Sequence, residues 1–140
     1  MKINFTTSLL AVACLSASVL GYAQSPVRAN IPFEFTIGQT VLPPGEYSIS
    51  NVSDRVIELR NWEKRVTVMV PATATAYVNQ KPHVLVFNVY GDQHFLHEVR
   101  GGLGEFNLDI RPSKLEKETQ RLAAVHANQQ NTEIALQKSH

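Results

Sequence analysis

The stretch HVLVFNVYGDQHFLHEVR, residues 83–100, decides the fold. Its first half, up to Tyr90, is the most hydrophobic run that follows the N-terminal segment, and it predicts a central strand. Gly91 and Asp92 stand where a two-residue hairpin needs positive φ angles, and residues 94–100 are expected to pair back. The stretch therefore predicts an antiparallel β-hairpin.

The same kind of pattern extends over residues 24–110. Short runs that alternate apolar and polar residues are separated by turn residues, as is typical of antiparallel all-β domains. We expect seven to eight strands in a meander that closes into a small barrel or folds as a sandwich, and we favour the barrel. The apolar residues expected to face inward are Ile31, Phe33, Phe35, Ile37, Tyr47, Ile49, Val52, Ile57, Leu59, Val66, Val68, Val70, Phe106, Leu108 and Ile110.

At Pro112 the period changes, and the β-domain (24–112) is expected to end there. Ser113 and Glu116 have the spacing of a capping box, in which the serine accepts an amide hydrogen and the glutamate reaches back. We predict a C-terminal helix over 113–126 that packs on the sheet through an apolar stripe and is a candidate for self-association. Residues 127–140 are expected to form a polar tail that frays or extends the helix. The stripe consists of Leu115, Leu122 and Val125.

The N-terminus has the three parts of a secretory signal peptide. Lys2 precedes an apolar run at 9–20, which is followed by small residues before a cleavage point predicted after Ala23. The run is shorter than the about 20 residues that a membrane-spanning helix needs, so the cleaved chain is not expected to span a membrane. We therefore predict residues 1–23 to be a signal peptide and the protein to be periplasmic or secreted. The alternative is a lipid anchor on Cys14, because residues 11–14 loosely resemble a lipoprotein cleavage box.

Cleavage after Ala23 has consequences for chemistry. It removes Cys14, the chain's one cysteine, so the mature protein has no disulfide, no thiol nucleophile and no cysteine ligand for zinc. It also removes Lys2, which leaves basic and acidic residues equal in number. The balanced charge gives no reason to expect a nucleic-acid partner.

The remaining residues suggest no enzyme and no cofactor. His94 and His97 are three apart, so on a strand their rings point to opposite faces and do not share a metal ion, although His83 is expected on the neighbouring strand. The sequence has no Gly-x-Ser-x-Gly motif for a nucleophilic serine and no obvious pair of catalytic carboxylates. The glycine-rich segment 101–104 precedes a strand-like run rather than a helix, and we interpret it as a connection instead of a phosphate-binding loop.

One hairpin tip carries a candidate contact surface. In RNWEKR, residues 60–65, three cations surround a single tryptophan, an arrangement that resembles contacts to nucleic acids or sugars. Neighbouring glutamates dilute the charge, which argues against a nucleic acid. The candidate contact residues are Trp62, Arg60, Lys64 and Arg65.

Several motifs together resemble a family of short, exported, uncharacterised bacterial proteins. The resembling segments are RANIPFEF (28–35), LPPGEY (42–47), YGD (90–92) followed by Phe95-Leu96, and the helix start at Pro112-Ser113. The resemblance implies export and a β-rich domain, and it assigns no activity.

We therefore expect an exported, non-catalytic β-domain that binds or assembles with an unknown protein or envelope partner. The first alternative is a periplasmic or extracellular carrier of a small apolar ligand, held in a barrel cavity lined by Phe33, Phe35, Phe87 and Phe95. The second alternative is a metal-dependent or hydrolytic enzyme that uses His83, His94 or His97.

Overall fold

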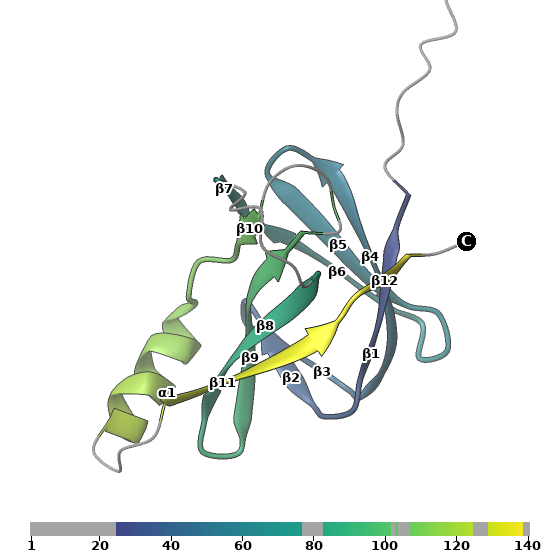
Figure 1. The fold of residues 1–140 in the computed structure, drawn as a ribbon. Helices are drawn as coiled ribbons and strands as arrows, with labels where there is room; N and C mark the ends of the chain where they lie inside the picture. The colour runs from purple at the N-terminus through teal and green to yellow at the C-terminus, as the bar shows by residue number, and fades with distance from the viewer. Residues whose placement is uncertain (1–24, 77–82, 102, 104–106, 125–128, 139–140) are drawn as a thin grey trace, which may run out of the picture.

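The computed structural model describes residues 25–76, 83–101, 103, 107–124 and 129–138, which form two β-sheets and one helix (Figure 1). The first sheet has the order β12-β1-β4-β5-β6, with β12 at Gln137–Lys138, β1 at Val27–Ile31, β4 at Gly45–Ser53, β5 at Val56–Asn61 and β6 at Val66–Pro71. The second sheet has the order β11-β8-β9-β10-β7, with β11 at Gln129–Ala135, β8 at Val84–Tyr90, β9 at Gln93–Arg100, β10 at Asn107–Asp109 and β7 at Thr73–Thr75. A short hairpin of β2 (Phe35–Ile37) and β3 (Thr40–Leu42) joins the second sheet, because β2 pairs in parallel with β9.

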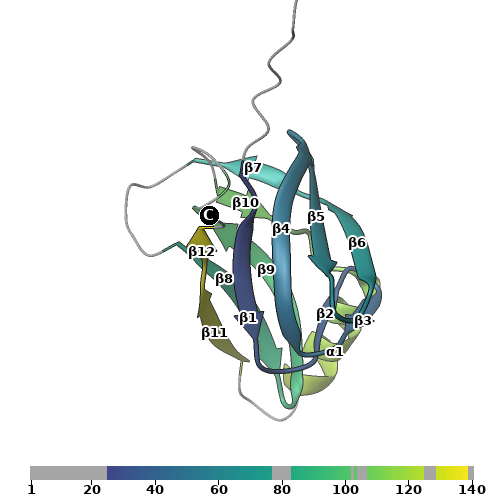
Figure 2. The ribbon, with the colours of Figure 1, turned by 90° about the vertical axis from the view of Figure 1, so that its right-hand side faces the viewer.

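The two sheets form a sandwich and do not close into a barrel (Figure 2). The chain passes between the sheets at Ala72, which separates β6 from β7, and at Leu136, which separates β11 from β12. At each of these residues the chain leaves one sheet and enters the other. Among the described residues, β6 pairs with β5 and with no further strand. The sandwich expectation is confirmed, whereas the preference for a barrel was wrong.

Alternation along the strands places the core between the sheets. On β4 and β5 the side chains of Tyr47, Ile49, Ile57 and Leu59 are fully buried, as the sequence predicts. Burying one such side chain stabilises the fold by about 1.5–3 kcal/mol. The core cluster also includes Ile31, Phe35, Ile37, Val70, Leu85, Phe87, Leu96, Val99, Leu108 and Ile110.

Two local irregularities change the expected strands. The run from Ile31 to Ile37 is broken after Ile31, because Pro32 has no amide hydrogen for the ladder, and Phe33 is only partly buried. Val52, expected to face inward, is exposed because the register of β4 against β5 shifts between Asn51 and Ser53. In the described residues up to 110, ten short strands take the place of the expected seven to eight.

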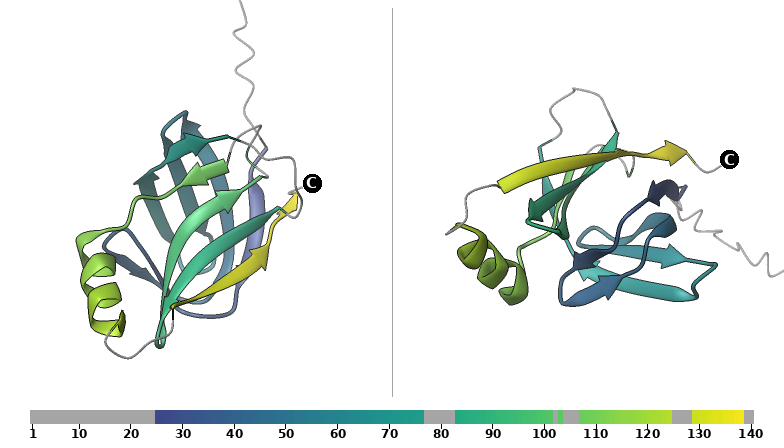
Figure 3. Two further views of the ribbon diagram at one scale, coloured as in Figure 1. Left: turned by 60° about the vertical axis from the view of Figure 1, so that its left-hand side comes forward. Right: turned by 90° about the horizontal axis from the view of Figure 1, so that it is seen from below.

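Strand β8 is buried on both faces, as expected for a central strand. It pairs with β9 through the predicted hairpin, in which Gly91 has a φ of 62°. One face of β8 packs against the first sheet, and the helix α1 (Lys114–Ala124) lies beside the other face (Figure 3). The predicted central hairpin is therefore confirmed.

The helix starts as predicted but packs differently. Ser113 accepts a hydrogen bond from the backbone N–H of Glu116 at 3.1 Å, which confirms the N-cap. The Glu116 side chain does not reach back. It is only 4% exposed and accepts hydrogen bonds from Asn88 Nδ2 at 3.0 Å and from the Tyr90 hydroxyl at 3.5 Å. Burial, and secondly the nearby Glu116 carboxylate, raise the pKa of Tyr90 above its ordinary value.

The predicted apolar stripe of the helix was wrong. Leu115 and Leu122 are exposed, and Glu116 is the residue of α1 that is buried. The reason is that α1 covers a part of β8 that carries the polar side chains of Asn88 and Tyr90, so a polar helix residue fits there. Val125, the third residue of the stripe, lies outside the described residues.

The C-terminal segment forms strands, so the expected frayed tail or helix extension was wrong. Strand β11 pairs with β8 from Gln129 opposite Tyr90 to Ala135 opposite Val84. A segment rich in polar residues can form this strand because its backbone N–H and C=O groups pair with an edge of β8 that would otherwise be open. Ile134 and Leu136 pack against the core from this segment.

Within the described part of the chain, no helix has the length and apolar character needed to cross a membrane. The predicted signal peptide, with Cys14 and the cleavage point after Ala23, lies outside the described residues, as do Phe106 and two glycines of the segment 101–104. Their predicted roles stay predictions.

Candidate binding surface

The turn between β5 and β6 holds Trp62 at the edge of the first sheet. The buried Asn61 side chain accepts a hydrogen bond from the backbone N–H of Lys64 through Oδ1, at 2.9 Å. Such a side-chain bond to the backbone is a common way to fix a turn. Gly45 makes room for Asn61, because a Cβ at that glycine would lie 2.6 Å from Asn61 Nδ2. The turn that presents Trp62 is therefore anchored in the sandwich.

Trp62 itself is 71% exposed. The guanidinium of Arg60 lies over its ring, with Cζ 4.7 Å from the ring centroid, which is a cation–π contact. Arg60 also pairs with Glu58, whose Oε1 lies 3.0 Å from Nη2. The Trp62 ring is thus in contact with the Arg60 guanidinium, which is in turn paired with the Glu58 carboxylate.

A surface hollow of about 390 Å³ adjoins Trp62. Its other lining residues are Arg28, Glu46, Ser48 and Glu63, and Arg28 Nη1 lies 3.3 Å from Glu46 Oε1. In the strand register Arg28 stands opposite Ser48, and Ser48 opposite Arg60. The hollow therefore combines one aromatic ring with a cationic hydrogen-bond donor, Arg28, and with the anionic acceptors Glu46 and Glu63.

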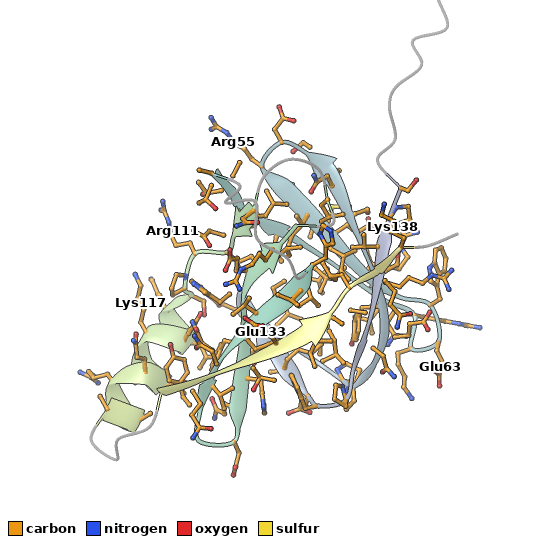
Figure 4. All side chains as sticks on the ribbon, in the orientation of Figure 1. Arg55, Glu63, Arg111, Lys117, Glu133 and Lys138 are labelled. Carbon is orange, nitrogen blue, oxygen red and sulfur yellow. The ribbon has the colours of Figure 1, made fainter. Side chains whose placement is uncertain are left out.

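The sequence identified only part of this surface. Of the three cations predicted around Trp62, the structure places Arg60 over the ring, whereas Lys64 lies 3.8 Å from Glu63 and Arg65 is exposed at the end of the turn. Figure 4 shows Glu63 at the far side of the molecule from Lys117 on α1. Arg28, Glu46 and Ser48 were missed, because only the register of β1 and β4 against β5 brings them to Trp62. We call the residues Arg28, Glu46, Ser48, Arg60, Trp62 and Glu63 the Trp62 surface.

The structure describes His83, His94 and His97, the three histidines considered as metal ligands. Among the described residues, no group of three or more His, Cys, Asp or Glu side chains is arranged to hold an ion. His94 instead stacks on Phe33, with ring centroids 3.9 Å apart and an interplanar angle of 17°. His83 lies against Gly101.

Of the four phenylalanines expected to line a cavity, three pack against one another and Phe95 packs against a tyrosine. Phe87 makes edge contacts with Phe33 at 5.1 Å and with Phe35 at 5.5 Å, measured between ring centroids. Phe95 contacts Tyr90, at 5.8 Å, beside the helix. Phe33 and Phe35 also line an open surface hollow of about 290 Å³ that Leu115 of α1 borders. Phe33, Phe35 and Phe87 are therefore joined by the edge-to-face contacts that aromatic pairs prefer.

These features define a small all-β sandwich with one helix near the C-terminus and an exposed aromatic surface on its first sheet. Compared with known proteins, the chain matches no family model, no curated protein and no solved structure.

Proposed function

We propose that this protein is an exported, non-catalytic β-sandwich that binds a partner of the cell envelope or of the cell exterior through the Trp62 surface. The observation that carries the proposal is the 71% exposure of Trp62. Its turn is anchored by the hydrogen bond of Asn61, and the guanidinium of Arg60 lies over its ring. Tryptophan and arginine are the residues that most often dominate binding energy at interfaces.

The charges of the surface indicate the kind of partner. Arg28 and Arg60 stand beside Glu46, Glu58 and Glu63, so neither sign dominates. A surface of this kind favours a neutral or mixed-charge partner with hydrogen-bonding groups over the uniformly anionic backbone of a nucleic acid. Glycan strands and polar protein surfaces both have that chemistry, and both occur in a cell envelope.

Export is tested first, by producing the full chain with its own leader in a bacterial host. We expect the protein in the periplasm or the medium, with an N-terminus at Gln24 in peptide sequencing. A diacylglyceryl mass on Cys14 in the membrane fraction would support the lipid-anchored alternative instead. An intact precursor that remains in the cytosol would contradict export.

Binding is tested by co-sedimentation of the purified protein with isolated cell envelopes. We expect Trp62→Ala to lower the association constant at least about tenfold, the loss that a dominant interface residue causes. Val52→Ala is the matched control, because Val52 is also exposed but lies outside the Trp62 surface. Trp62 is the chain's one tryptophan, so its fluorescence reports on this surface alone. The proposal fails if the wild-type protein stays in the supernatant, or if Trp62→Ala sediments as the wild type does.

A further inference from the structure

In the part of the chain that the structure describes, strand β6 is an open edge without charge. It ends the order of the first sheet, and Figure 2 shows it at the right-hand margin of that sheet. Its sequence, VTVMVP, contains no charged residue, and Met69 is 59% exposed. Natural edge strands are usually protected from other chains by charged side chains, by proline or by a covering element. Here Pro71 stands only at the end of the strand.

The backbone geometry shows which groups of β6 are free to pair. Ala72 donates its N–H to the Arg55 carbonyl at 2.8 Å, directly beyond the pairing of Val56 with Pro71. Because antiparallel partners alternate along a strand, Val70, Val68 and Val66 also direct their N–H and C=O groups to β5. The corresponding groups of Thr67 and Met69 therefore point away from the sheet. They are the donors and acceptors that a further strand would use.

We propose that two copies of this chain pair through β6, antiparallel about a two-fold axis at Val68. In this register Thr67 of each copy lies opposite Met69 of the other. Their outward N–H and C=O groups then form two hydrogen bonds on each side of the axis. The first sheet becomes continuous across both copies.

The absence of charge favours a second copy of this chain as the occupant. A two-fold interface places the same surface on both sides, so a charged edge would bring like charges together. Between Val66 and Pro71 no such repulsion arises. Pairing would also shield Met69 and the partly exposed Val66 and Val68, which are apolar.

One end of β6 carries a turn and the other adjoins a hollow. At its start the turn 62–65 projects, and beside its end a hollow of about 550 Å³ is lined by Asp54, Arg55, Ala72, Thr73 and Ala74. An antiparallel two-fold pairing brings the turn of each copy to the hollow of the other. The turn carries Glu63, Lys64 and Arg65, and the hollow carries Asp54 and Arg55, so each side offers partners of opposite charge to the other.

The test is the molar mass of the purified protein, measured by sedimentation velocity over a range of concentrations. We expect the wild-type protein to be a dimer at about 100 µM, and Met69→Lys to weaken dimerisation at least about tenfold, since it places a charge on the edge. Thr67→Pro removes an outward N–H but no bond to β5, and we expect the same loss. Far-UV circular dichroism checks that both variants keep the fold.

Two controls carry the same kind of change elsewhere. Val52→Lys adds a charge at an exposed valine of β4, and Leu122→Lys adds one to the exposed face of α1. Both should remain dimers. The proposal is overturned if the wild-type protein is monomeric at about 100 µM, which would leave the edge to a different partner. It is also overturned if Leu122→Lys dissociates the dimer while Met69→Lys does not, because self-association would then use the helix. The turn 62–65 takes part in both proposals, so envelope binding is also measured with Met69→Lys. A monomeric variant that still binds envelopes, or a dimer that does not bind them, shows that one proposal fails without the other.

Discussion

The interior of the sandwich and the helix α1 follow opposite rules of burial. Between the sheets, Phe87 and Leu59 are fully buried, as their hydrophobicity predicts. On α1 the charged Glu116 is buried at 4% exposure, whereas the apolar Leu122 is 61% exposed. The difference teaches that hydrophobicity decides burial only where a large apolar surface lies opposite, as one sheet does for the other. The helix meets β8 at the polar side chains of Asn88 and Tyr90, and hydrogen bonding decides its orientation.

The largest expected effect comes from the interior. Phe87→Ala removes a ring that contacts both Phe33 and Phe35, and we expect it to lower the free energy of unfolding by about 3–5 kcal/mol. Urea denaturation of the variant and the wild type measures the loss. Phe87→Leu, which keeps most of the volume, should lose less. A loss below about 1 kcal/mol for Phe87→Ala would show that the rings do not form the core. It would contradict the claim that hydrophobicity decides burial between the sheets.

The second effect tests whether the buried glutamate holds the helix. Glu116→Ala leaves the Asn88 amide without its acceptor in a buried position, and we expect a loss of about 1–3 kcal/mol. Glu116→Gln keeps an acceptor oxygen and should lose less than the alanine variant. Urea denaturation again gives the values. If Glu116→Ala were as stable as the wild type, the carboxylate would contribute nothing to docking of α1.

The third effect compares the two buried tyrosines at high pH. Burial is the main cause that raises the pKa of both Tyr47 and Tyr90 above 10.0, and Glu116 adds to it only at Tyr90. The folded chain therefore keeps these phenol protons at a pH where the unfolded chain releases them. It follows that stability present below pH 10 decreases as the pH rises above 10.

Replacement by phenylalanine checks this pH dependence. Tyr47→Phe and Tyr90→Phe should each reduce the decline of unfolding free energy above pH 10.0. At neutral pH, Tyr47→Phe should cost about 1 kcal/mol, because its hydroxyl donates to the Pro43 carbonyl at 2.6 Å. Denaturation across this pH range measures both quantities. An unchanged slope in both variants would mean that neither phenol is shielded from water.

The smallest effect is expected on the outer face of the helix. Leu122→Ala removes an exposed side chain and should change the free energy of unfolding by less than about 0.5 kcal/mol. The same substitution type in the interior, Leu59→Ala, should cost several times more. A loss of about 2 kcal/mol or more for Leu122→Ala would show that the apolar stripe predicted from the sequence is buried, and would contradict the difference between interior and helix described above.

Much of the sandwich could be predicted because its signals are local. Alternation identified the inward face of β4 and β5, Gly91 marked the central hairpin, and Ser113 marked the start of the helix. The candidate surface was only half predicted. Trp62 and Arg60 are neighbours in sequence, but Arg28 reaches them only through the register of β1 and β4.

The errors arise where a distant segment decides the outcome. The polar run of β11 has little hydrophobic pattern, and it becomes a strand because β8 offers an open edge. Glu116 is buried because β8 places Asn88 opposite it. Neither partner is visible within a short window of sequence.

The amino-acid order alone determined which residues form strands in the main part of the sandwich, which of their faces is apolar and where the helix begins. These properties depend on neighbours in the chain, through the two-residue period of a strand and the bonding of a helix cap. The tertiary structure decided that the sheets form a sandwich instead of a barrel, that the C-terminal segment completes both sheets, and that a glutamate is buried while leucines face water. Each of these depends on hydrogen bonds and packing between segments far apart in the chain, for which local periodicity holds no information.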